Sequence, residues 1–135
     1  MSEHREYIAL MGNPNSGKTA IFNLLTSMNL KVSNYPGITV EIRQGTARIS
    51  PDKTIEIMDL PGTYSLKPES MDETIVAQQT LRWMGGEDRP KAIISVVDAA
   101  NLSRNLYLTS QLLDMDIPVI VALNMMDRVR RRKQD

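Results

Sequence analysis

One segment of the sequence has the residue types and spacing to bind phosphate groups. The run Gly12-Asn13-Pro14-Asn15-Ser16-Gly17-Lys18-Thr19 fits the pattern G-x-x-x-x-G-K-[ST] at every fixed position. Glycine at both ends lets the backbone wrap around phosphate oxygens, and the N–H groups of residues 15–19 face them at the positive end of a helix. We predict that Lys18 bridges the β- and γ-phosphates, that Thr19 offers its hydroxyl to Mg²⁺, and that Ala20 also borders the nucleotide.

A second candidate group is Asp59-Leu60-Pro61-Gly62, an Asp-x-x-Gly pattern that directly follows an apolar segment. The pattern is weak alone and gains weight because it follows the phosphate loop. We expect Asp59 to hold Mg²⁺ through water and the Gly62 N–H to contact a γ-phosphate, so that this loop senses the γ-phosphate. Thr39 precedes this group, where a threonine can complete the magnesium shell while the γ-phosphate remains.

A third candidate group is Asn124-Met125-Met126-Asp127, which resembles the guanine motif N-K-x-D with Met125 in place of lysine. The Asp127 carboxylate can accept hydrogen bonds from the ring N–H and the exocyclic amine of guanine, whereas adenine has its donor elsewhere. We expect Asn124 to join this loop to the phosphate loop and Met125 to lie along the purine. The predicted ligand is therefore GTP or GDP.

Alternating apolar patterns predict the strands and helices that bring these groups together. Each group follows a short apolar segment, and ligand loops in open α/β sheets gather at the carboxyl ends of the strands. The segments before and after Pro51-Asp52 are predicted to form an antiparallel hairpin, and residues 30–39 are predicted to be a loop. The predicted strands are 7–11, 40–49, 54–59, 92–97 and 117–123, and the predicted helices are 17–28, 70–85 and 102–113.

Two of the predicted helices carry more specific expectations, one about an apolar face and one about a helix start. In the helix after the phosphate loop, Leu24, Leu25 and Met28 are placed on one apolar face together with Ile21. Ser70 and Glu73 have the spacing at which a hydroxyl and a carboxylate reciprocally satisfy free N–H groups, so a helix is predicted to begin there.

Composition restricts the class of protein. The chain has 135 residues, 41% hydrophobic and 24% charged, which favours one globular domain. It has no cysteine, which excludes disulfides, thiolate metal sites and thiol nucleophiles, and its polar start lacks a signal-peptide pattern, so we expect a soluble, non-secreted piece. We divide it into a GTP-binding domain over 1–127 and a basic tail over 128–135, the latter interpreted as a solvated helix end or linker in preference to a phospholipid or RNA patch.

Longer segments around these motifs resemble a known family. They are GNPNSGKT, SNYPGITVE, DLPGTYSL, SVVDAANLSRNLYLTSQLL and IPVIVALNMMD, and together they resemble the amino-terminal GTP-binding domain of the FeoB-type ferrous iron transporters. The resemblance implies an α/β P-loop NTPase fold, a three-layer sandwich whose mostly parallel sheet has one antiparallel edge strand. The family's fifth guanine motif, last strand and last helix should follow Asp127, so we expect a truncated domain.

The resemblance also implies partners and a location. In the family this domain precedes a helical domain and a membrane-embedded iron permease, on the cytoplasmic side of the bacterial inner membrane. The expected partners are therefore those two domains and a guanine nucleotide, with no nucleic acid.

Catalysis is predicted to be slow. GTP hydrolysis depends on positioning water and stabilising phosphoryl charge, and Thr63 stands where many GTPases have a water-positioning glutamine. The resemblance suggests that K⁺ neutralises charge between the phosphates, with Asn15 as a side-chain ligand, although Asn15 has the alternative of hydrogen bonding within its loop. The residues expected to act in catalysis are Asn15, Lys18, Thr39 and Gly62.

Two other functions remain open from the residues. The first is a nucleotide-sensing module without significant turnover, which Thr63 favours. The second is a ribosome- or tRNA-associated GTPase with its basic tail on RNA, which predicts RNA binding that weakens steeply with salt.

Overall fold

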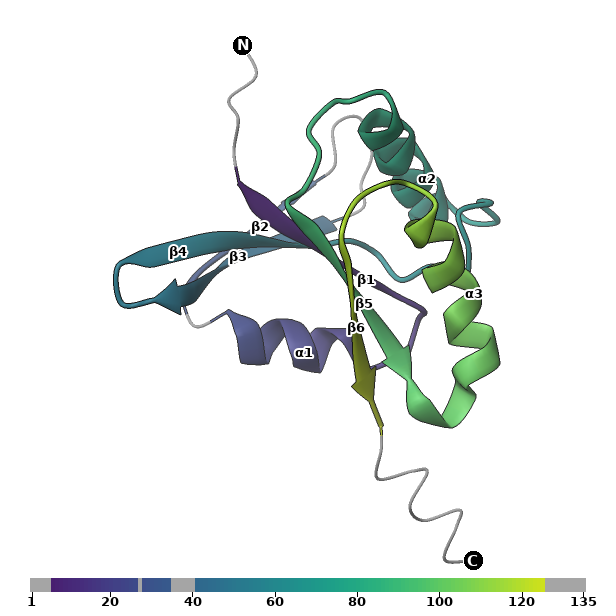
Figure 1. Ribbon diagram of the computed structural model, residues 1–135, viewed down its shortest axis with the longest axis horizontal. Helices are drawn as coiled ribbons and strands as arrows, with labels where there is room; N and C mark the ends of the chain where they lie inside the picture. Colours follow the sequence, from purple (N-terminus) through teal and green to yellow (C-terminus); the bar gives the residue numbers. More distant parts are fainter. Residues whose placement is uncertain (1–5, 27, 35–40, 126–135) are drawn as a thin grey trace, which may run out of the picture.

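A six-stranded sheet organises the chain, whose computed structural model describes residues 6–26, 28–34 and 41–125 (Figure 1). The strand order is β2-β3-β4-β1-β5-β6, which places β1 and its following loop near the middle of the sheet. The strands are β1 (Tyr7–Gly12), β2 (Met28–Asn34), β3 (Glu41–Ser50), β4 (Lys53–Asp59), β5 (Ala92–Asp98) and β6 (Val119–Asn124).

The sheet is mostly parallel. Strands β4, β1, β5 and β6 run in one direction, so their carboxyl ends, which carry the predicted site residues, meet at one edge. Strand β3 runs antiparallel to both β2 and β4, and the predicted hairpin of β3 and β4 is present.

Strand β2 corrects two expectations. Residues 30–34 were predicted to be loop, but they belong to β2, which is the outermost strand on its side. The antiparallel strand β3 is therefore one place inside the edge, not at it. Leu30 and Val32 lie at alternate positions with Lys31 between them, the period expected of a strand, and both side chains are exposed.

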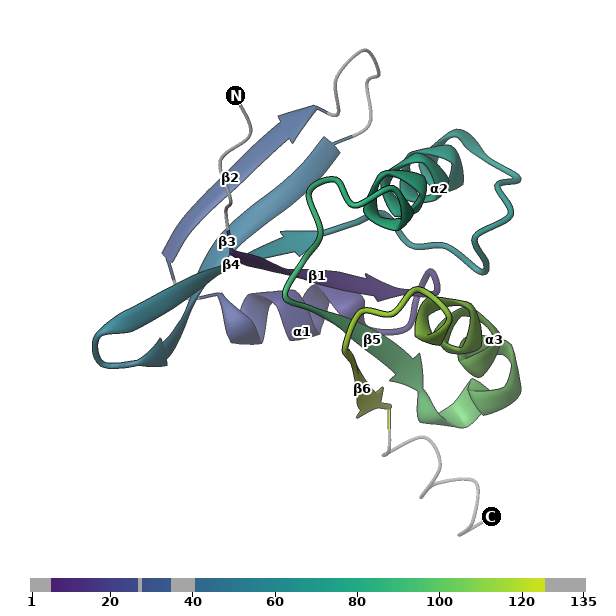
Figure 2. The ribbon, with the colours of Figure 1, turned by 45° about the horizontal axis from the view of Figure 1, so that its top comes forward.

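In the part of the chain that the structure describes, three α-helices cover the two faces of the sheet. Helix α1 (Lys18–Leu25) lies against one face, whereas α2 (Met71–Met84) and α3 (Leu102–Leu113) lie against the other (Figures 1 and 2). A short 3-10 turn, η1 (Ala99–Asn101), leads from β5 into α3. The sheet and these helices form the expected three-layer sandwich.

Helix α1 is shorter than predicted. It ends at Leu25 because Thr26 takes an extended conformation and its hydroxyl donates to the Phe22 carbonyl. Met28 therefore begins β2 and does not continue the helix, which corrects the prediction for residues 26–28. The predicted apolar face is also wrong, since Leu24 is 82% exposed while Phe22 is fully buried under the sheet.

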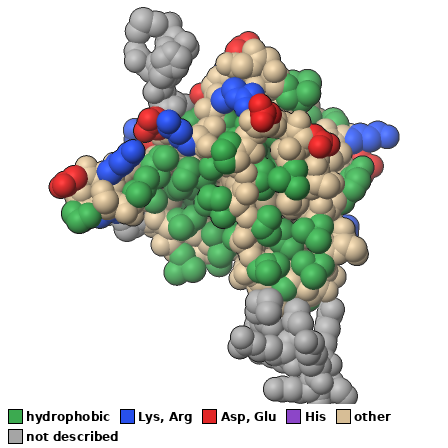
Figure 3. Space-filling model, viewed as in Figure 1, with side chains coloured by type: hydrophobic (Ala, Val, Ile, Leu, Met, Phe, Trp, Pro, Cys, Tyr) green, Lys and Arg blue, Asp and Glu red, His purple; other side chains and the backbone are tan. Residues whose placement is uncertain are grey.

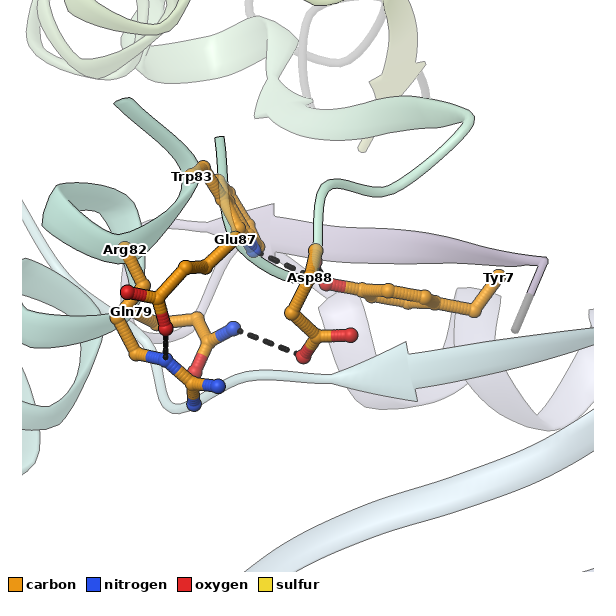
Figure 4. A network of polar contacts seen from close by, with 6 residues as sticks. All are labelled: Tyr7, Gln79, Arg82, Trp83, Glu87 and Asp88. Carbon is orange, nitrogen blue, oxygen red and sulfur yellow. Dashed lines mark hydrogen bonds and ion pairs between the residues drawn. The ribbon is translucent and has the colours of Figure 1, made fainter. Parts of the chain in front are cut away.

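A polar network fastens the carboxyl end of α2 to the amino end of β1 (Figure 4). The Tyr7 hydroxyl accepts a hydrogen bond from Trp83 Nε1 at 2.9 Å and donates one to the Asp88 carbonyl at 2.5 Å. Gln79 Nε2 adds a bond to the Asp88 carboxylate at 3.4 Å. Tyr7 and Trp83 are both buried, so their polar atoms are satisfied inside the core.

Strand β6 exposes apolar side chains at the other edge of the sheet. Ile120, Val121 and Leu123 are each about half exposed. The face drawn in Figure 3 likewise shows many apolar side chains, with charged groups mostly toward its margins.

No helix among the described residues has both the length and the apolar composition needed to cross a bilayer.

Candidate nucleotide-binding site

The phosphate loop lies between β1 and α1, as its pattern predicts. Gly17 caps the start of α1 with φ +88°, a conformation that favours glycine. A Cβ added at Gly17 would lie 2.0 Å from Asn124 Nδ2 and 2.8 Å from the Met125 methyl carbon. Glycine is therefore required both by its backbone angle and by the close approach of the loop after β6.

Asn124 holds that second loop against the phosphate loop. Its side-chain Nδ2 donates to the Ser16 carbonyl at 3.1 Å, which joins the end of β6 to residues just before α1. Met125, the next residue, has a positive φ of 64° and is half-buried. The two loops thus lie side by side at the carboxyl edge of the sheet.

The phosphate loop contains buried polar atoms without partners among the described residues. They are both side-chain amide atoms of Asn13 and the hydroxyl of Ser16, in side chains that are 3% and 1% exposed. Buried polar groups are normally hydrogen-bonded, so these atoms fit a loop that is completed by a polar ligand.

Lys18 and Asp59 bring the first two predicted groups into direct contact. The Lys18 amine donates to an Asp59 carboxylate oxygen from the first turn of α1 to the end of β4. Burial raises the pKa of Asp59, and the nearby Lys18 ammonium opposes that change. A carboxylate and a hydroxyl, that of Thr19, are oxygen ligands of the kind that Mg²⁺ prefers, so the donor set fits the predicted ion.

The Asp59–Gly62 loop packs directly on the phosphate loop. The Leu60 N–H donates to the Leu10 carbonyl at 3.2 Å, and the Thr63 N–H donates to the Gly12 carbonyl at 3.0 Å. A Cβ added at Gly62 would lie 3.0 Å from the backbone of Pro14. Glycine at position 62 therefore permits this approach.

The remaining predicted residues divide into two groups. Asn15, Thr19 and Ala20 are solvent-exposed beside the loop, and Pro61 is half-buried. Thr39, Met126 and Asp127 lie outside the described residues, so the predicted second magnesium ligand and the base-reading carboxylate have no described position.

Glu73 has a different role from the predicted one. The Ser70 hydroxyl accepts from the Glu73 N–H at 3.2 Å, which confirms half of the predicted capping pair. The Glu73 carboxylate, however, binds the preceding loop: it accepts from the Thr63 hydroxyl, the Tyr64 N–H and the Glu69 N–H, each at 3.0 Å. These bonds reach both ends of residues 63–69, which we call the 63–69 loop.

The surroundings of Glu73 favour its charged form. The Tyr64 N–H lowers the pKa of Glu73 most, burial opposes this, and the Glu69 N–H and the Thr63 hydroxyl lower it further. The sequence indicated that a carboxylate at this position turns back toward the preceding segment, but it did not indicate which groups of that segment it meets.

Helix α3 supplies contacts to the same loop that sequence reasoning missed. Gln111 Oε1 accepts from the Leu66 N–H at 2.9 Å, in the middle of the loop. The Arg104 guanidinium lies 4.1 Å from the centre of the Tyr64 ring. Both residues stand in the segment 95–113 that contributes to the family resemblance, but neither belongs to a phosphate-, metal- or base-binding pattern, and only the packing of α3 beside the loop shows their contacts.

A model of the family described as ferrous iron transport protein B matches residues 6–135. The chain belongs to the FeoB family. The resemblance deduced from the motifs is thereby confirmed. The Fe(2+) transporter FeoB of Salmonella typhimurium is 48% identical over 130 residues, which cover 93% of the chain. An Fe(2+) transport protein A/FeoB fusion protein of Porphyromonas gingivalis is 49% identical over 125 residues, again 93% of the chain.

The chain matches only a small part of these FeoB relatives. It spans 16% of the length of the Salmonella transporter and 14% of the Porphyromonas fusion protein. Both are named as Fe(2+) transport proteins, and those names describe the longer proteins.

Solved FeoB domains share the fold. The cytosolic domain of L. pneumophila FeoB is 48% identical with a TM-score of 0.84, over 94% of this chain and 48% of that one. An S. thermophilus NFeoB mutant bound to GDP is 46% identical with a TM-score of 0.82, over 96% and 48% of the two chains. The G domain of T. maritima FeoB is 39% identical with a TM-score of 0.82, over 95% and 77%. The predicted P-loop NTPase fold is therefore confirmed.

Proposed function

We propose that this FeoB-family chain binds GTP and GDP with Mg²⁺ and hydrolyses GTP slowly, as the nucleotide-operated domain of a ferrous iron transport protein. The observation that carries the proposal is the hydrogen bond from Asn124 to the Ser16 carbonyl, because it joins the base-reading loop to the phosphate loop. The S. thermophilus relative bound to GDP supports the same ligand.

Each loop then has a defined task toward the nucleotide. The N–H groups of residues 15–19 and the Lys18 amine bind the phosphates, and the rest of the phosphate loop from Gly12 to Ala20 shapes the cradle. Asp127 reads the guanine, with Met125 and Met126 beside it. Thr19, Thr39 and Asp59 hold Mg²⁺, which when bound neutralises charge on the phosphate oxygens.

The 60–63 segment responds to the γ-phosphate. We expect Gly62 to offer its N–H to that phosphate within the Leu60-Pro61-Gly62 segment. The close approach of Gly62 to Pro14 and the backbone bonds of Leu60 and Thr63 to β1 support this role. Thr63 is fully buried, and its hydroxyl already contacts the Ser65 carbonyl and the Glu73 carboxylate. That hydroxyl is not available to position water, which supports slow turnover.

K⁺ is the proposed activating cation. Asn15 is exposed on the phosphate loop, which supports a role for its side-chain oxygen toward a cation. We expect KCl to raise turnover over NaCl at equal ionic strength and Asn15→Ala to remove the difference. Equal rates of the wild type in both salts would count against this part of the proposal.

The nucleotide assignment is tested by titrating fluorescent GDP and ADP analogues into the chain, with and without Mg²⁺. We expect GDP to bind more tightly than ADP, the Asp127→Ala variant to lose that preference, and Lys18→Ala to weaken both nucleotides. Tighter binding of ADP by the wild type would overturn the assignment of guanine.

A second candidate is a nucleotide-sensing module whose occupancy matters more than its hydrolysis, and the engaged hydroxyl of Thr63 favours it. Single-turnover hydrolysis and nucleotide dissociation rates separate the two functions. Hydrolysis faster than GTP dissociation supports a GTPase switch, whereas dissociation that is much faster supports the sensing module.

The proposed setting is that of the longer FeoB proteins. Residues 1–127 form the GTP-binding domain and 128–135 a basic tail leading toward helical and membrane-embedded iron-permease domains, on the cytoplasmic side of the bacterial inner membrane. We expect no nucleic acid partner, and binding of RNA that weakens steeply with salt would contradict this.

A further inference from the structure

Helix α3 contributes none of the predicted nucleotide-binding residues, yet it holds the loop that follows Gly62. The 63–69 loop is fastened at its two ends by Glu73 from α2 and at its middle by Gln111 from α3. Arg104, two turns before Gln111 on α3, covers the Tyr64 ring. The loop is therefore fastened to both helices on its side of the sheet.

The bond from Leu66 to Gln111 is the central contact between the loop and α3. It pairs a backbone N–H with a side-chain amide oxygen at 2.9 Å in a partly buried position. The Leu66 side chain packs at the margin of the main apolar core, so the bond and the packing hold the same residue. The Arg104–Tyr64 contact is more exposed, since Tyr64 is 37% exposed, and it is the weaker of the two.

The conformation held in this way belongs to a site in which Lys18 contacts Asp59. A triphosphate must draw Lys18 from that carboxylate, and the chain runs directly from Asp59 through Gly62 into the 63–69 loop. We infer that a shift of the loop toward a γ-phosphate strains the Leu66–Gln111 bond, because Leu66 is fixed by that bond in the middle of the loop.

The loop and α3 are held together at separate contacts and are not closely packed along their whole length. An open cavity of about 340 Å³ lies between the loop and α3, lined by Tyr64, Lys67, Arg104 and Tyr107 among others. The Gln111 and Arg104 contacts therefore hold the loop beside this cavity, and not as part of a continuously packed interface.

We propose that Gln111 and Arg104 are positioning residues that hold the 63–69 loop in the conformation seen here and so set the preference between GTP and GDP. This inference rests on the proposed function. The loop exchanges between the held state and a state that contacts the γ-phosphate, and GTP favours the second while GDP does not distinguish them. Loss of one net hydrogen bond shifts such a balance by about fivefold.

The test measures dissociation constants for GDP and for a non-hydrolysable GTP analogue, with Mg²⁺ present, on the full chain. We expect Gln111→Ala to bind the GTP analogue about fivefold more tightly, with GDP affinity unchanged, and Arg104→Ala to change affinity in the same direction by a smaller factor. Gln111→Glu keeps an acceptor oxygen for the Leu66 N–H and is expected to bind both nucleotides as the wild type does. Gln78→Ala, an exposed glutamine on α2, is the matched control and should change neither affinity.

The outcomes separate this inference from the proposed function. An unchanged ratio of the two affinities in both alanine variants, or a parallel weakening of both nucleotides, overturns the role of α3 while leaving nucleotide binding intact. Absence of guanine nucleotide binding by the wild type overturns the proposed function and this inference with it. Arg104 lies on the surface, so its variant remains informative even if Gln111→Ala lowers the thermal stability of the chain.

Discussion

The amine of Lys18 is bonded to the carboxylate of Asp59, so two groups assigned to the phosphates and to Mg²⁺ neutralise each other. Their side chains are only 11% and 8% exposed, so water screens the pair weakly. Under the proposed function a nucleotide takes Lys18 away from Asp59, and a bound magnesium ion would give the released carboxylate a new partner. Binding of the phosphates and binding of the metal are thus expected to assist each other.

The Asp59→Asn variant tests this exchange. Removing the charge frees Lys18, so we expect GDP without Mg²⁺ to bind about tenfold more tightly than it does to the wild type, the value of a charge-assisted hydrogen bond. Addition of Mg²⁺ should then give little further gain. The measurement is a GDP titration with and without Mg²⁺, with Asp52→Asn in the exposed β3–β4 turn as the control. Weaker Mg²⁺-free binding by Asp59→Asn than by the wild type would contradict the exchange.

The Glu73 carboxylate should make stability depend on pH. Its pKa is lowered in the folded chain, chiefly by the Tyr64 N–H, so it stabilises the fold above the ordinary value of 4.5. That contribution is lost as the pH falls through the lowered pKa. We expect Glu73→Gln to reduce the free energy of unfolding at pH 7 by about 1–3 kcal/mol, because loop donors lose a charged acceptor.

Chemical denaturation at several pH values measures this effect. The difference between wild type and Glu73→Gln should shrink as the pH falls below 4.5, because the carboxyl of the unfolded chain binds a proton first, and it should be lost as the pH passes through the lowered pKa of the folded chain. Asp72→Asn, in the same first turn of α2 but exposed, is the control and should change stability by less than about 0.5 kcal/mol. A difference that stays constant down to acid pH would show that the charge of Glu73 does not hold the loop.

Local patterns predicted the motif loops and the sheet edge at which they meet, because each motif follows an apolar strand of the usual length. The same patterns did not predict β2. Asn34 and the proline and glycine after it are typical of loops, and they favoured a loop over the strand that the alternation of Leu30 and Val32 indicates. The patterns also extended α1 through Met28, because apolar spacing does not reveal that Thr26 turns the chain. The contact of Gln111 could not be predicted from the sequence, because its partner Leu66 is 45 residues away along the chain and only the packing of α3 brings the two residues together.

Gly17 is expected to tolerate no side chain. In Gly17→Ala the methyl group would meet Asn124 Nδ2 at 2.0 Å, so the bond from Asn124 to Ser16 must break or the loop after β6 must move. We expect loss of measurable GDP binding and a lower thermal midpoint. Gly86→Ala provides a matched control, because Gly86 has a similar φ of +86° but no atom within 4 Å of the added Cβ.

The comparison separates backbone strain from collision. Gly86→Ala should lower the free energy of unfolding by about 1 kcal/mol, from the positive φ alone, and leave GDP affinity unchanged. Equal effects of the two substitutions on both stability and GDP binding would mean that the approach of Asn124 to Gly17 is unimportant.

The Tyr7 hydroxyl is expected to support the fold without affecting the nucleotide site. It lies at the first residue of β1, whereas the phosphate loop begins at the last residue of the same strand, Gly12. Tyr7→Phe keeps the buried ring but removes the acceptor of Trp83 Nε1 and the donor to the Asp88 carbonyl. Trp83 is fully buried, and a buried polar group such as its Nε1 that is left without a partner costs about 1–3 kcal/mol, so the free energy of unfolding should fall by that amount.

Urea denaturation followed by the fluorescence of Trp83, the single tryptophan, measures this loss directly. The control is Tyr107→Phe, whose ring is 58% exposed on α3 and whose hydroxyl faces no such burial penalty. GDP affinity of Tyr7→Phe should match the wild type, because the chain between the network and the phosphate loop is a rigid central strand. A fall in GDP affinity comparable to the loss of stability would contradict this expectation. It would show that the polar network of Tyr7 and Trp83, at the amino end of β1, is coupled to the nucleotide site at the carboxyl end of that strand.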